Sequence, residues 1–181
     1  MLISQRVTST DSAHFPALDA LYCRAFPWHE QREAGAKQQA LDYPHYELEA
    51  WFDDGLFIGL SGCWRFTDYV YIEHLAVDDR LRSRGYGKRL LAEILQRAPL
   101  TILEIDPLIS ETAHKRLRFY ETMGFCANPW AHRHPTYHQG IADHELIVLS
   151  YPQPINEAQY QRFAQDLRLV VMDRAGAAKV L

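Results

Sequence analysis

The sequence predicts an α/β fold, in which a mixed sheet carries helices on both of its faces. Between residues 46 and 77, three apolar strand-like runs are separated only by short turns, as in a meander. Between residues 69 and 105, a strand, a helix and a strand follow one another, which implies one parallel pair. With 181 residues and 48% apolar composition, the chain fits one core without a second domain.

The N-terminal part predicts a strand, two helices and the meander, in that order. Apolar residues between Phe15 and Ala25 fall on one helical face, and Pro27 then breaks the helix. Asp53-Asp54-Gly55 and Thr67-Asp68 are turn-like and divide the strands of the meander. The expected elements are a strand at residues 2 to 7, helices at 11 to 26 and 30 to 41, and three strands from 46 to 77.

The C-terminal part predicts three further helices and two strands. Ser110 can cap a helix that Gly124 stops in the left-handed conformation, with Phe125 folding back as an apolar contact. Asn156, with Gln159 three positions later, is typical of a capping box that opens the last helix. The expected elements are helices at 85 to 98, at 110 to 123 and from 156 onward, and strands at 100 to 105 and 145 to 151. The last helix bears an apolar stripe at Tyr160, Phe163, Ala164, Leu167 and Val171.

Charge and composition exclude several classes of protein. A formal net charge of -4 argues against nucleic acid as a partner, because binding to the phosphate backbone usually requires a broad basic surface. No export signal opens the chain, and no apolar run approaches the roughly 20 residues that span a bilayer. Cys23, Cys63 and Cys126 are odd in number and far apart, which argues against a disulfide framework. We therefore expect a cytoplasmic protein without a membrane partner.

The most informative segment is Arg82-Ser83-Arg84-Gly85-Tyr86-Gly87, between a predicted strand and a predicted helix. Its glycines let the backbone approach a ligand, and the unpaired N–H groups that open the helix favour an anion such as a diphosphate. The segment is not a Walker loop, and Leu90 stands where a dinucleotide-binding loop has its third glycine. The basic residues around it are Arg80, Arg82, Arg84, Lys88 and Arg89, for which a solvated helix face is the alternative interpretation.

The same segment fits the pattern Arg/Gln-x-x-Gly-x-Gly/Ala, and here the chain resembles the GCN5-related N-acetyltransferases (GNAT). The resemblance covers roughly residues 1 to 151, is strongest from residue 73 to 125, and leaves residues 152 to 181 as a C-terminal helical extension packed on or beside that domain. It implies a mixed, mostly antiparallel central sheet. It also implies transfer of an acetyl group from acetyl-CoA to a primary amine of a small molecule or peptide, by direct attack in a ternary complex.

The resemblance further implies how acetyl-CoA is held. In the family, the strand before the loop carries a bulge and splays from its neighbour, so that free N–H groups hold the pantetheine arm and the thioester carbonyl. By position these groups belong to Leu75, Ala76 and Val77, and one such donor can contribute about 3 kcal/mol. Ser110 stands where an asparagine often holds pantetheine, and Asp79 where a proline is common. The cofactor-binding loop comprises Arg82, Ser83, Arg84, Gly85, Tyr86, Gly87 and Lys88.

Tyr120 is the first candidate for the chemistry. The sequence Phe119-Tyr120-Glu121, followed by Gly124-Phe125, looks like the family's Tyr-x-x-x-Gly-Phe ending, whose hydroxyl lies near the coenzyme sulfur. A departing thiolate is easier to expel beside a proton donor. A core tyrosine with its hydroxyl in a polar contact is the alternative.

Glu73 is the second candidate, as the general base that deprotonates the amine. Burial between apolar neighbours would raise its pKa toward a useful value. Strand alternation points Glu73 to one face and His74 to the other, so we expect His74 to be a packed core histidine. A structural carboxylate with a water chain as the base is the alternative, and Glu104 is a weaker candidate.

A histidine-rich segment precedes the last strand, at His132, His134, His138 and His144. Without regular spacing, and without a nearby carboxylate or cysteine pair, we expect no metal site. In the family, loops near this end and the N-terminal helices shape the acceptor pocket. Candidate acceptor contacts are therefore Trp28, His29, Glu30, Trp130 and Tyr137.

Two other functions stay open. A non-catalytic acyl-CoA-binding module would keep the loop and lack a working proton relay. An interaction protein would form a homodimer through the stripe of the last helix, although packing of that helix on its own sheet is the favoured use. Cys63 and Cys126 lie in apolar strand surroundings that would raise the pKa of a thiol, so we expect no covalent enzyme intermediate.

Overall fold

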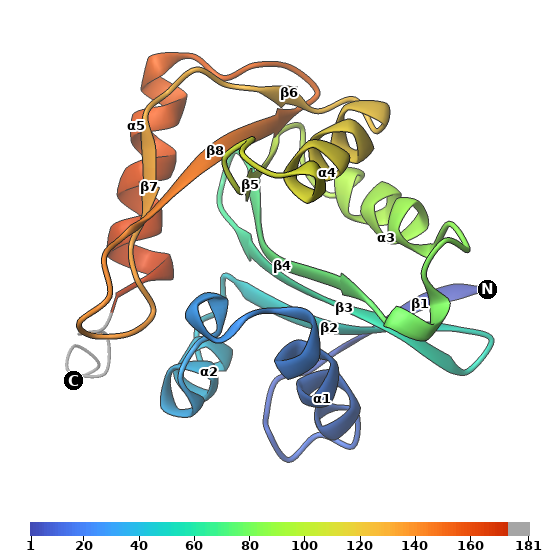
Figure 1. The fold of residues 1–181 in the computed structure, drawn as a ribbon. Helices are drawn as coiled ribbons and strands as arrows, with labels where there is room; N and C mark the ends of the chain where they lie inside the picture. The colour runs from blue at the N-terminus through green and yellow to red at the C-terminus, as the bar shows by residue number, and fades with distance from the viewer. Residues whose placement is uncertain (174–181) are drawn as a thin grey trace.

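The computed structural model describes residues 1–173, and its elements follow nearly the predicted order (Figure 1). The strands are β1 (Leu2–Arg6), β2 (Tyr46–Asp53), β3 (Leu56–Arg65), β4 (Val70–Val77), β5 (Thr101–Ile105), β6 (Cys126–Ala127), β7 (His132–His134) and β8 (His144–Tyr151). The helices are α1 (Phe15–Ala25), η1 (Trp28–Glu30), α2 (Ala34–Leu41), η2 (Asp79–Leu81), α3 (Tyr86–Leu95), α4 (Glu111–Thr122), α5 (Glu157–Asp166) and η3 (Leu167–Val171).

The strands form one sheet with the order β1-β2-β3-β4-β5-β8-β6, and β7 pairs with β8 off this path. Within the described residues, β4 and β5 are the parallel pair and the other neighbours are antiparallel. The predicted mixed, mostly antiparallel sheet is therefore confirmed.

Helices cover both faces of the sheet (Figure 1). On one face, α3 and α4 pack over a core that includes Leu90, Ile94 and Phe125. On the other face, α1, α2 and α5 pack over a second core that includes Leu21 and Phe163. The apolar periodicity predicted for α1, α3, α4 and α5 thus correctly indicated the side that each of them buries.

The last helix packs on its own sheet. Asn156 and Gln159 form the predicted capping box, and a π-helical turn, η3, continues α5. Four residues of the predicted stripe are buried, namely Tyr160, Phe163, Leu167 and Val171. The fifth, Ala164, packs against the same core. Because this stripe is already covered by the chain itself, it offers no face for pairing subunits.

The N-terminal helices are shorter than predicted, for a reason that bears on function. The expected helix at residues 30 to 41 is divided into η1 and α2, and Gln31 and Glu33 between them have extended backbone angles. Pro16 lies in the first turn of α1, where its missing N–H costs no hydrogen bond. The extended break turns Arg32 inward, so that its side chain is 9% exposed.

A bulge interrupts β4 beside β3. Gly62 pairs with His74 and Cys63 pairs with Ile72, which leaves Glu73 as an extra residue on β4. Such a bulge places two consecutive side chains on the same face of a sheet. Glu73 contacts Trp64 and His74 contacts Tyr22, both on the face covered by α1, so the predicted alternation of Glu73 and His74 is wrong.

Two further details complete the frame of the site. Ser110 caps α4 by accepting a hydrogen bond from the Ala113 N–H at 3.1 Å, as predicted. Gly124 has the expected left-handed backbone, with φ of +93°, and Phe125 folds back into the core. The histidine-rich segment contains a short strand that was not predicted, β7, which pairs with the start of β8.

Candidate active site

The parallel strands β4 and β5 part after a short contact. They pair at Val70 with Thr101 and at Tyr71 with Ile102, and among the described residues the rest of β4 has no strand neighbour on that side (Figure 1). A cleft of about 660 Å³ opens there, lined by residues 72 to 77 of β4, residues 103 to 105 of β5 and the following Asp106. The splay that the family resemblance implies is present in this chain.

The backbone of β4 offers two N–H groups to this gap. Hydrogen bonding toward one neighbour alternates along an antiparallel strand. The Asp78 N–H donates to the carbonyl of Ile58 in β3 at 2.9 Å, so the backbone of Ala76, two residues earlier, also faces β3. A Cβ on Gly59 would lie 2.4 Å from the Ala76 carbonyl oxygen, in agreement with that direction.

The N–H groups of Leu75 and Val77 therefore point into the cleft. The N–H of Ala76 does not, which corrects the expectation that all three amides are free, although the Ala76 side chain lines the cleft. Backbone N–H groups alternate between the two edges of a strand, just as side chains alternate between its two faces. The bulge at Glu73 decides which of the N–H groups after it point toward the cleft.

The loop after η2 prepares the N-terminus of α3 for an anion. Ser83 has φ of +63° and Gly85, the N-cap, has φ of +78°, a conformation that glycine adopts at little cost. No side chain caps this end, and no acidic residue lies in the first turn. The N–H groups of the first turn thus stay open to a negatively charged ligand.

The basic cluster divides into two groups. Arg80 is paired with the buried Asp78 at 2.8 Å, and Arg89 with Asp53 at 2.9 Å, so both have structural partners. Hydrogen bonds from Arg80 hold the pKa of the Asp78 carboxyl well below its ordinary value. The other three members of the cluster, Arg82, Arg84 and Lys88, are exposed and form no ion pair with the described residues.

These three cations surround the uncapped end of α3, and Arg82 also lines the cleft. Tyr86 belongs to the structural group, because its hydroxyl donates to Asp53 at 3.1 Å. Asp79 is exposed and lies 3.5 Å from Arg24. A solvated helix face would account for the exposure of Arg84 and Lys88. It would not account for their position beside the uncapped end of α3.

Tyr120 lies in the cleft with its hydroxyl available. Its ring packs edge-on against Phe119 and Phe125, and it is half-buried. Burial raises the pKa of Tyr120 above its ordinary value, while Arg116 acts in the opposite direction, so the phenol is protonated at neutral pH. The hydroxyl makes no hydrogen bond to the residues that the structure describes. The alternative interpretation, a core tyrosine whose hydroxyl has a polar contact, requires such a bond.

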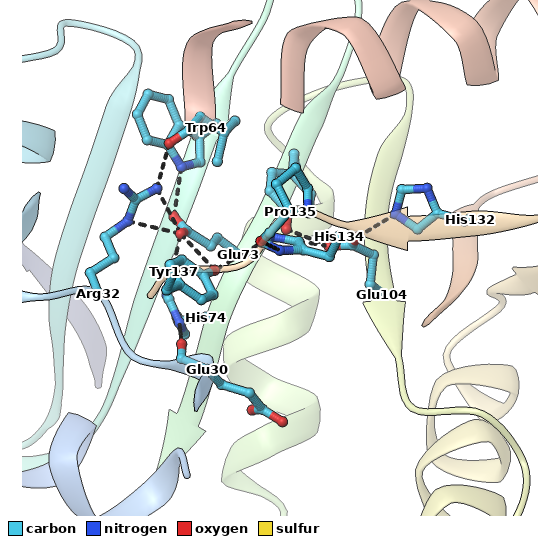
Figure 2. Close-up of polar contacts among 12 residues, drawn as sticks. Glu30, Arg32, Trp64, Glu73, His74, Glu104, His132, His134, Pro135 and Tyr137 are labelled. Atoms are coloured by element: carbon cyan, nitrogen blue, oxygen red, sulfur yellow. Dashed lines mark hydrogen bonds and ion pairs between the residues drawn. The ribbon is translucent and has the colours of Figure 1, made fainter. Parts of the chain in front are cut away.

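Glu73 lies in the cleft wall but is saturated with partners (Figure 2). Arg32 approaches its carboxylate at 2.7 Å, the Trp64 Nε1–H donates to it at 2.7 Å, and the Tyr137 hydroxyl donates at 3.0 Å. Burial favours the neutral acid, but Arg32, His74 and Trp64 outweigh it and hold the pKa of Glu73 below its ordinary value.

The expectation that burial raises the pKa of Glu73 is therefore wrong. Sequence reasoning missed Arg32, which lies 41 residues away along the chain and carries no local signal. A carboxylate that is fully paired and shifted toward the charged form is a weak base. The alternative of a structural carboxylate fits this geometry better.

Glu104 is held in the same way. The His132 Nε2 contacts its carboxylate (Figure 2). The Tyr71 hydroxyl also contacts this carboxylate, and the side chain of Glu104 is 6% exposed. Burial favours the neutral acid, but His134 and His132 outweigh it and lower the pKa of Glu104. From the sequence, no carboxylate was expected near the histidine-rich segment, but Glu104 lies there. Its contact with His132 anchors β7 to β5.

Comparison with known proteins identifies the family. Residues 15–125, more than half of the chain, match the Acetyltransferase (GNAT) family. The chain belongs to the GNAT acetyltransferase family. Its matched region includes α1, the meander, the bulged strand β4, the loop, α3 and α4 with Tyr120.

Known structures agree with this assignment. A putative GNAT-family acetyltransferase from Bacteroides thetaiotaomicron is 27% identical, with a TM-score of 0.87 over 93% of this chain and 97% of that one. The ribosomal-protein-S18-alanine N-acetyltransferase from Escherichia coli is 18% identical, with a TM-score of 0.60 over 86% and 96% of the two chains, which shows the fold alone.

A curated relative matches over a shorter segment. The putative acetyltransferase YjbC from Bacillus subtilis is 29% identical over 62 residues, which are 33% of this chain. The match spans about a third of that protein's length, 32%.

In this GNAT acetyltransferase, three of the five candidate acceptor contacts line the cleft, namely His29, Glu30 and Tyr137. Trp28 instead stacks on His138, with ring centroids 3.7 Å apart, and lines a separate hollow. Trp130 stacks on Tyr160 and donates to the Ile155 carbonyl at 3.2 Å, away from the cleft.

The histidines of the histidine-rich segment contact several different groups. His132 binds Glu104 and Tyr160, His134 contacts the Pro135 carbonyl, and His138 contacts the Trp28 carbonyl. Among residues 1–173, no group of three metal-ligating side chains comes together. His74 is 3% exposed and packs against Tyr22 and Phe26, as a core histidine does, while also lining the cleft.

Two global features complete the description of the enzyme. In the part of the chain that the structure describes, no helix is both long and apolar enough to cross a bilayer. Cys63 is buried, and burial raises the pKa of its thiol well above the ordinary value. A thiol held in this protonated form is a poor nucleophile.

Proposed function

We propose that this enzyme transfers an acetyl group from acetyl-CoA to a primary amine of a small molecule or peptide, by direct attack within a ternary complex. The observation that carries the proposal is one continuous cleft. Arg82, which precedes the uncapped end of α3, lies at its donor side. Two strand amides lie along its wall, and the Tyr120 hydroxyl, which has no hydrogen-bond partner among the described residues, lies inside it.

The donor half fits acetyl-CoA residue by residue. The first-turn amides of α3, with Arg82, Arg84 and Lys88, would bind the diphosphate. The N–H groups of Leu75 and Val77 would bind the pantetheine arm and the thioester carbonyl. Ser110 Oγ accepts the capping bond of α4, which leaves its hydroxyl hydrogen to donate to the coenzyme. A GNAT neighbour from Elizabethkingia anophelis was solved with acetyl-CoA bound, which supports this donor.

The chemistry follows from these groups. Attack on a thioester places negative charge on its oxygen, and a fixed amide donor there can contribute about 3 kcal/mol. The sulfur that departs needs a proton, and the protonated phenol of Tyr120 can supply it. Direct attack requires no enzyme nucleophile, in keeping with the raised pKa of the Cys63 thiol.

The acceptor half favours an amine that arrives as a cation. Glu30, Asp106, Asp143 and Glu145 line the cleft, and Arg116, the cation that the described residues place beside them, is paired with Asp106 at 3.2 Å. The Arabidopsis thaliana neighbour Naa50, 17% identical, was solved with the bisubstrate analogue CoA-Ac-MVNAL, so a peptide amine is one class to test. At this identity the likeness shows the fold alone.

Two measurements test the proposal. First, CoA should raise the melting temperature, because only the folded cleft gathers the diphosphate ligands; at a concentration of 100 Kd the stabilisation is about 2.7 kcal/mol, or roughly 5–10 °C. Second, the enzyme should release CoA from acetyl-CoA in the presence of one member of an amine panel. The panel comprises spermidine, ethanolamine, kanamycin and a peptide with a free N-terminus.

The outcomes separate the proposal from its rival. A thermal shift with no turnover for any amine would favour the non-catalytic acyl-CoA-binding module. The absence of a shift at millimolar CoA would overturn the donor assignment itself.

A further inference from the structure

Glu30 differs from the two buried glutamates of the cleft wall, Glu73 and Glu104. Its side chain is 31% exposed, whereas those of Glu73 and Glu104 are 0% and 6% exposed. Within the described residues its carboxylate has no hydrogen-bond donor, and its nearest ion-pair partner, His29 Nε2, lies 3.7 Å away. The carboxylate is therefore free to accept a proton.

The backbone of Glu30 is pinned to the bulge of β4. The His74 Nε2 contacts the Glu30 carbonyl oxygen at 2.9 Å, and the Glu30 N–H donates to the Pro27 carbonyl at 2.9 Å. His74 is the residue before Leu75, whose N–H points into the cleft. The hydrogen bond thus holds η1 next to the place where the thioester carbonyl would bind.

The side chain of Glu30 extends away from the Arg32 and Glu73 pair (Figure 2). The charged groups that act on its carboxylate are His29 of η1, Asp106 after β5, Arg116 of α4 and His134 of β7, and all four line the cleft. Glu30 lines the same cleft as these four groups, so its carboxylate belongs to the polar lining of the acceptor half.

We propose that Glu30 is the general base of this acetyltransferase, taking a proton from the ammonium group of the acceptor directly or through one water molecule. The assignment rests on the proposed function, because it presupposes an amine acceptor. Asp106 is not equivalent, since Arg116 pairs with it at 3.2 Å.

The electrostatic surroundings suit this role. Burial raises the pKa of Glu30 and Asp106 raises it further, and together they outweigh His29, Arg116 and His134. A carboxylate with a pKa closer to the working pH accepts a proton more effectively while remaining ionised at neutral pH. Glu73 and Glu104 are shifted in the opposite direction.

The proton inventory of the reaction balances. The ammonium gives one proton to Glu30, and the nitrogen lone pair forms the C–N bond at the thioester carbon. When the C–S bond breaks, the electron pair goes to sulfur, which takes a proton from Tyr120. The second proton lost by nitrogen restores the phenol, and Glu30 releases its proton to solvent.

Glu30→Gln tests the proposal, with Glu145→Gln as its control. Glu145 is exposed at the same cleft and loses the same charge. With acetyl-CoA and the panel amine that is acetylated fastest, Glu30→Gln should lower kcat/KM by about 10²-fold at neutral pH. The control should stay within about threefold, the scale expected when one exposed charge is removed.

The pH profile identifies a base rather than a structural residue. Without a base only the free amine reacts, so the deficit of Glu30→Gln should shrink by about tenfold per pH unit as pH rises toward the pKa of the amine. Hydroxylamine, already unprotonated at neutral pH, should be acetylated at nearly equal rates by both proteins. A constant deficit at every pH, or an equal loss with hydroxylamine, would overturn the proposal.

A measurement without turnover completes the design. The carboxyl resonance of Glu30, assigned in 13C-glutamate-labelled enzyme with CoA by its loss in Glu30→Gln, should titrate at the pH of the acid limb of kcat/KM. A mismatch of more than one pH unit would overturn the assignment. Failure of the wild-type enzyme to acetylate any amine would instead refute the proposed function, whatever the variant does.

Discussion

Tyr120 is a residue whose burial and hydrogen bonding point to chemistry. It lines the cleft, it is protonated at neutral pH, and its hydroxyl has no hydrogen-bond partner among the described residues. A buried tyrosine usually finds a partner for its hydroxyl, so an unpaired one in a cleft is poised for a ligand. Here the ligand that the cleft would bring is the coenzyme sulfur.

We expect Tyr120→Phe to lower kcat by about 10²-fold while the affinity for acetyl-CoA changes little, because the hydroxyl acts mainly as sulfur gains charge. Steady-state kinetics with a separate CoA titration measures the two effects. Full activity in this variant would show that another group protonates the sulfur. A higher KM for acetyl-CoA at unchanged kcat would make Tyr120 a binding contact.

Glu73 illustrates how a buried acid can serve structure. Replacing one partner of a buried ion pair leaves the other charge unpaired, at a cost of about 3–5 kcal/mol. We therefore expect Glu73→Gln to lower the free energy of unfolding by about 3 kcal/mol, measured by urea denaturation. Arg32, 9% exposed, would lose its main partner.

The matched control is Glu47→Gln, which breaks a more exposed pair. Its partner Arg65, at 3.0 Å, is 44% exposed, and its second partner Arg97, at 3.5 Å, keeps a closer pair with Glu49 at 2.6 Å. The loss should therefore stay below about 1 kcal/mol. If Glu73→Gln proved as stable as Glu47→Gln and yet inactive, Glu73 would be a catalytic group after all.

At the scale of elements, the bulge in β4 organises the site. It places Glu73 and His74 on one face, sets the phase by which Leu75 and Val77 point into the gap, and provides the contact that holds η1. The parting of β4 from β5 then leaves those amides without a strand partner. One extra residue thus shapes both halves of the cleft.

The loop before α3 is the second decisive element, and two glycines allow a clean test of it. Gly85 and Gly55 have similar backbones, with φ of +78° and +83°, and in each case an added Cβ would meet no atom within 4 Å. Valine therefore strains both turns alike. We expect Gly85→Val alone to abolish CoA binding, because its side chain would enter the space for the diphosphate.

Isothermal titration with CoA, together with circular dichroism, measures this pair of variants. Gly55→Val, in the turn between β2 and β3, should bind CoA like the wild type. Equal affinity in both variants would refute the assignment of the loop, and equal loss would trace the effect to strain.

At the scale of the whole molecule, several buried groups make stability depend on pH. The pKa values of Glu73 and Glu104 are lowered, and burial also lowers the pKa of His74. A group with a folded pKa below its unfolded value stabilises the protein above the unfolded pKa and loses that contribution as pH falls through the folded one.

We therefore expect the free energy of unfolding to decline from about pH 6.5, where an unfolded histidine titrates, and more steeply below about pH 4.3, where unfolded glutamates do. Urea denaturation over a pH series measures the curve. Glu73→Gln should flatten the steeper part, and an unchanged slope would show that Glu73 does not contribute to the acid sensitivity.

The sequence by itself determined the features that depend on neighbouring residues. Helix caps at Ser110 and Asn156, the left-handed stop at Gly124, the loop around Gly85 and the apolar stripes are local, because a side chain and the backbone within four positions decide them. The element order and the family resemblance followed from the same local patterns.

Only the tertiary structure decided the protonation and the direction of the groups in the cleft. Glu73 meets Arg32 across 41 residues and Glu104 meets His132 across 28, so no local pattern could show that both carboxylates are already paired. The bulge depends on the register between β3 and β4. The Glu30 carboxylate is unpaired because folding brings no hydrogen-bond donor of the described residues to it. A pKa is set by the charges and the burial that folding assembles, and these are properties of space rather than of sequence.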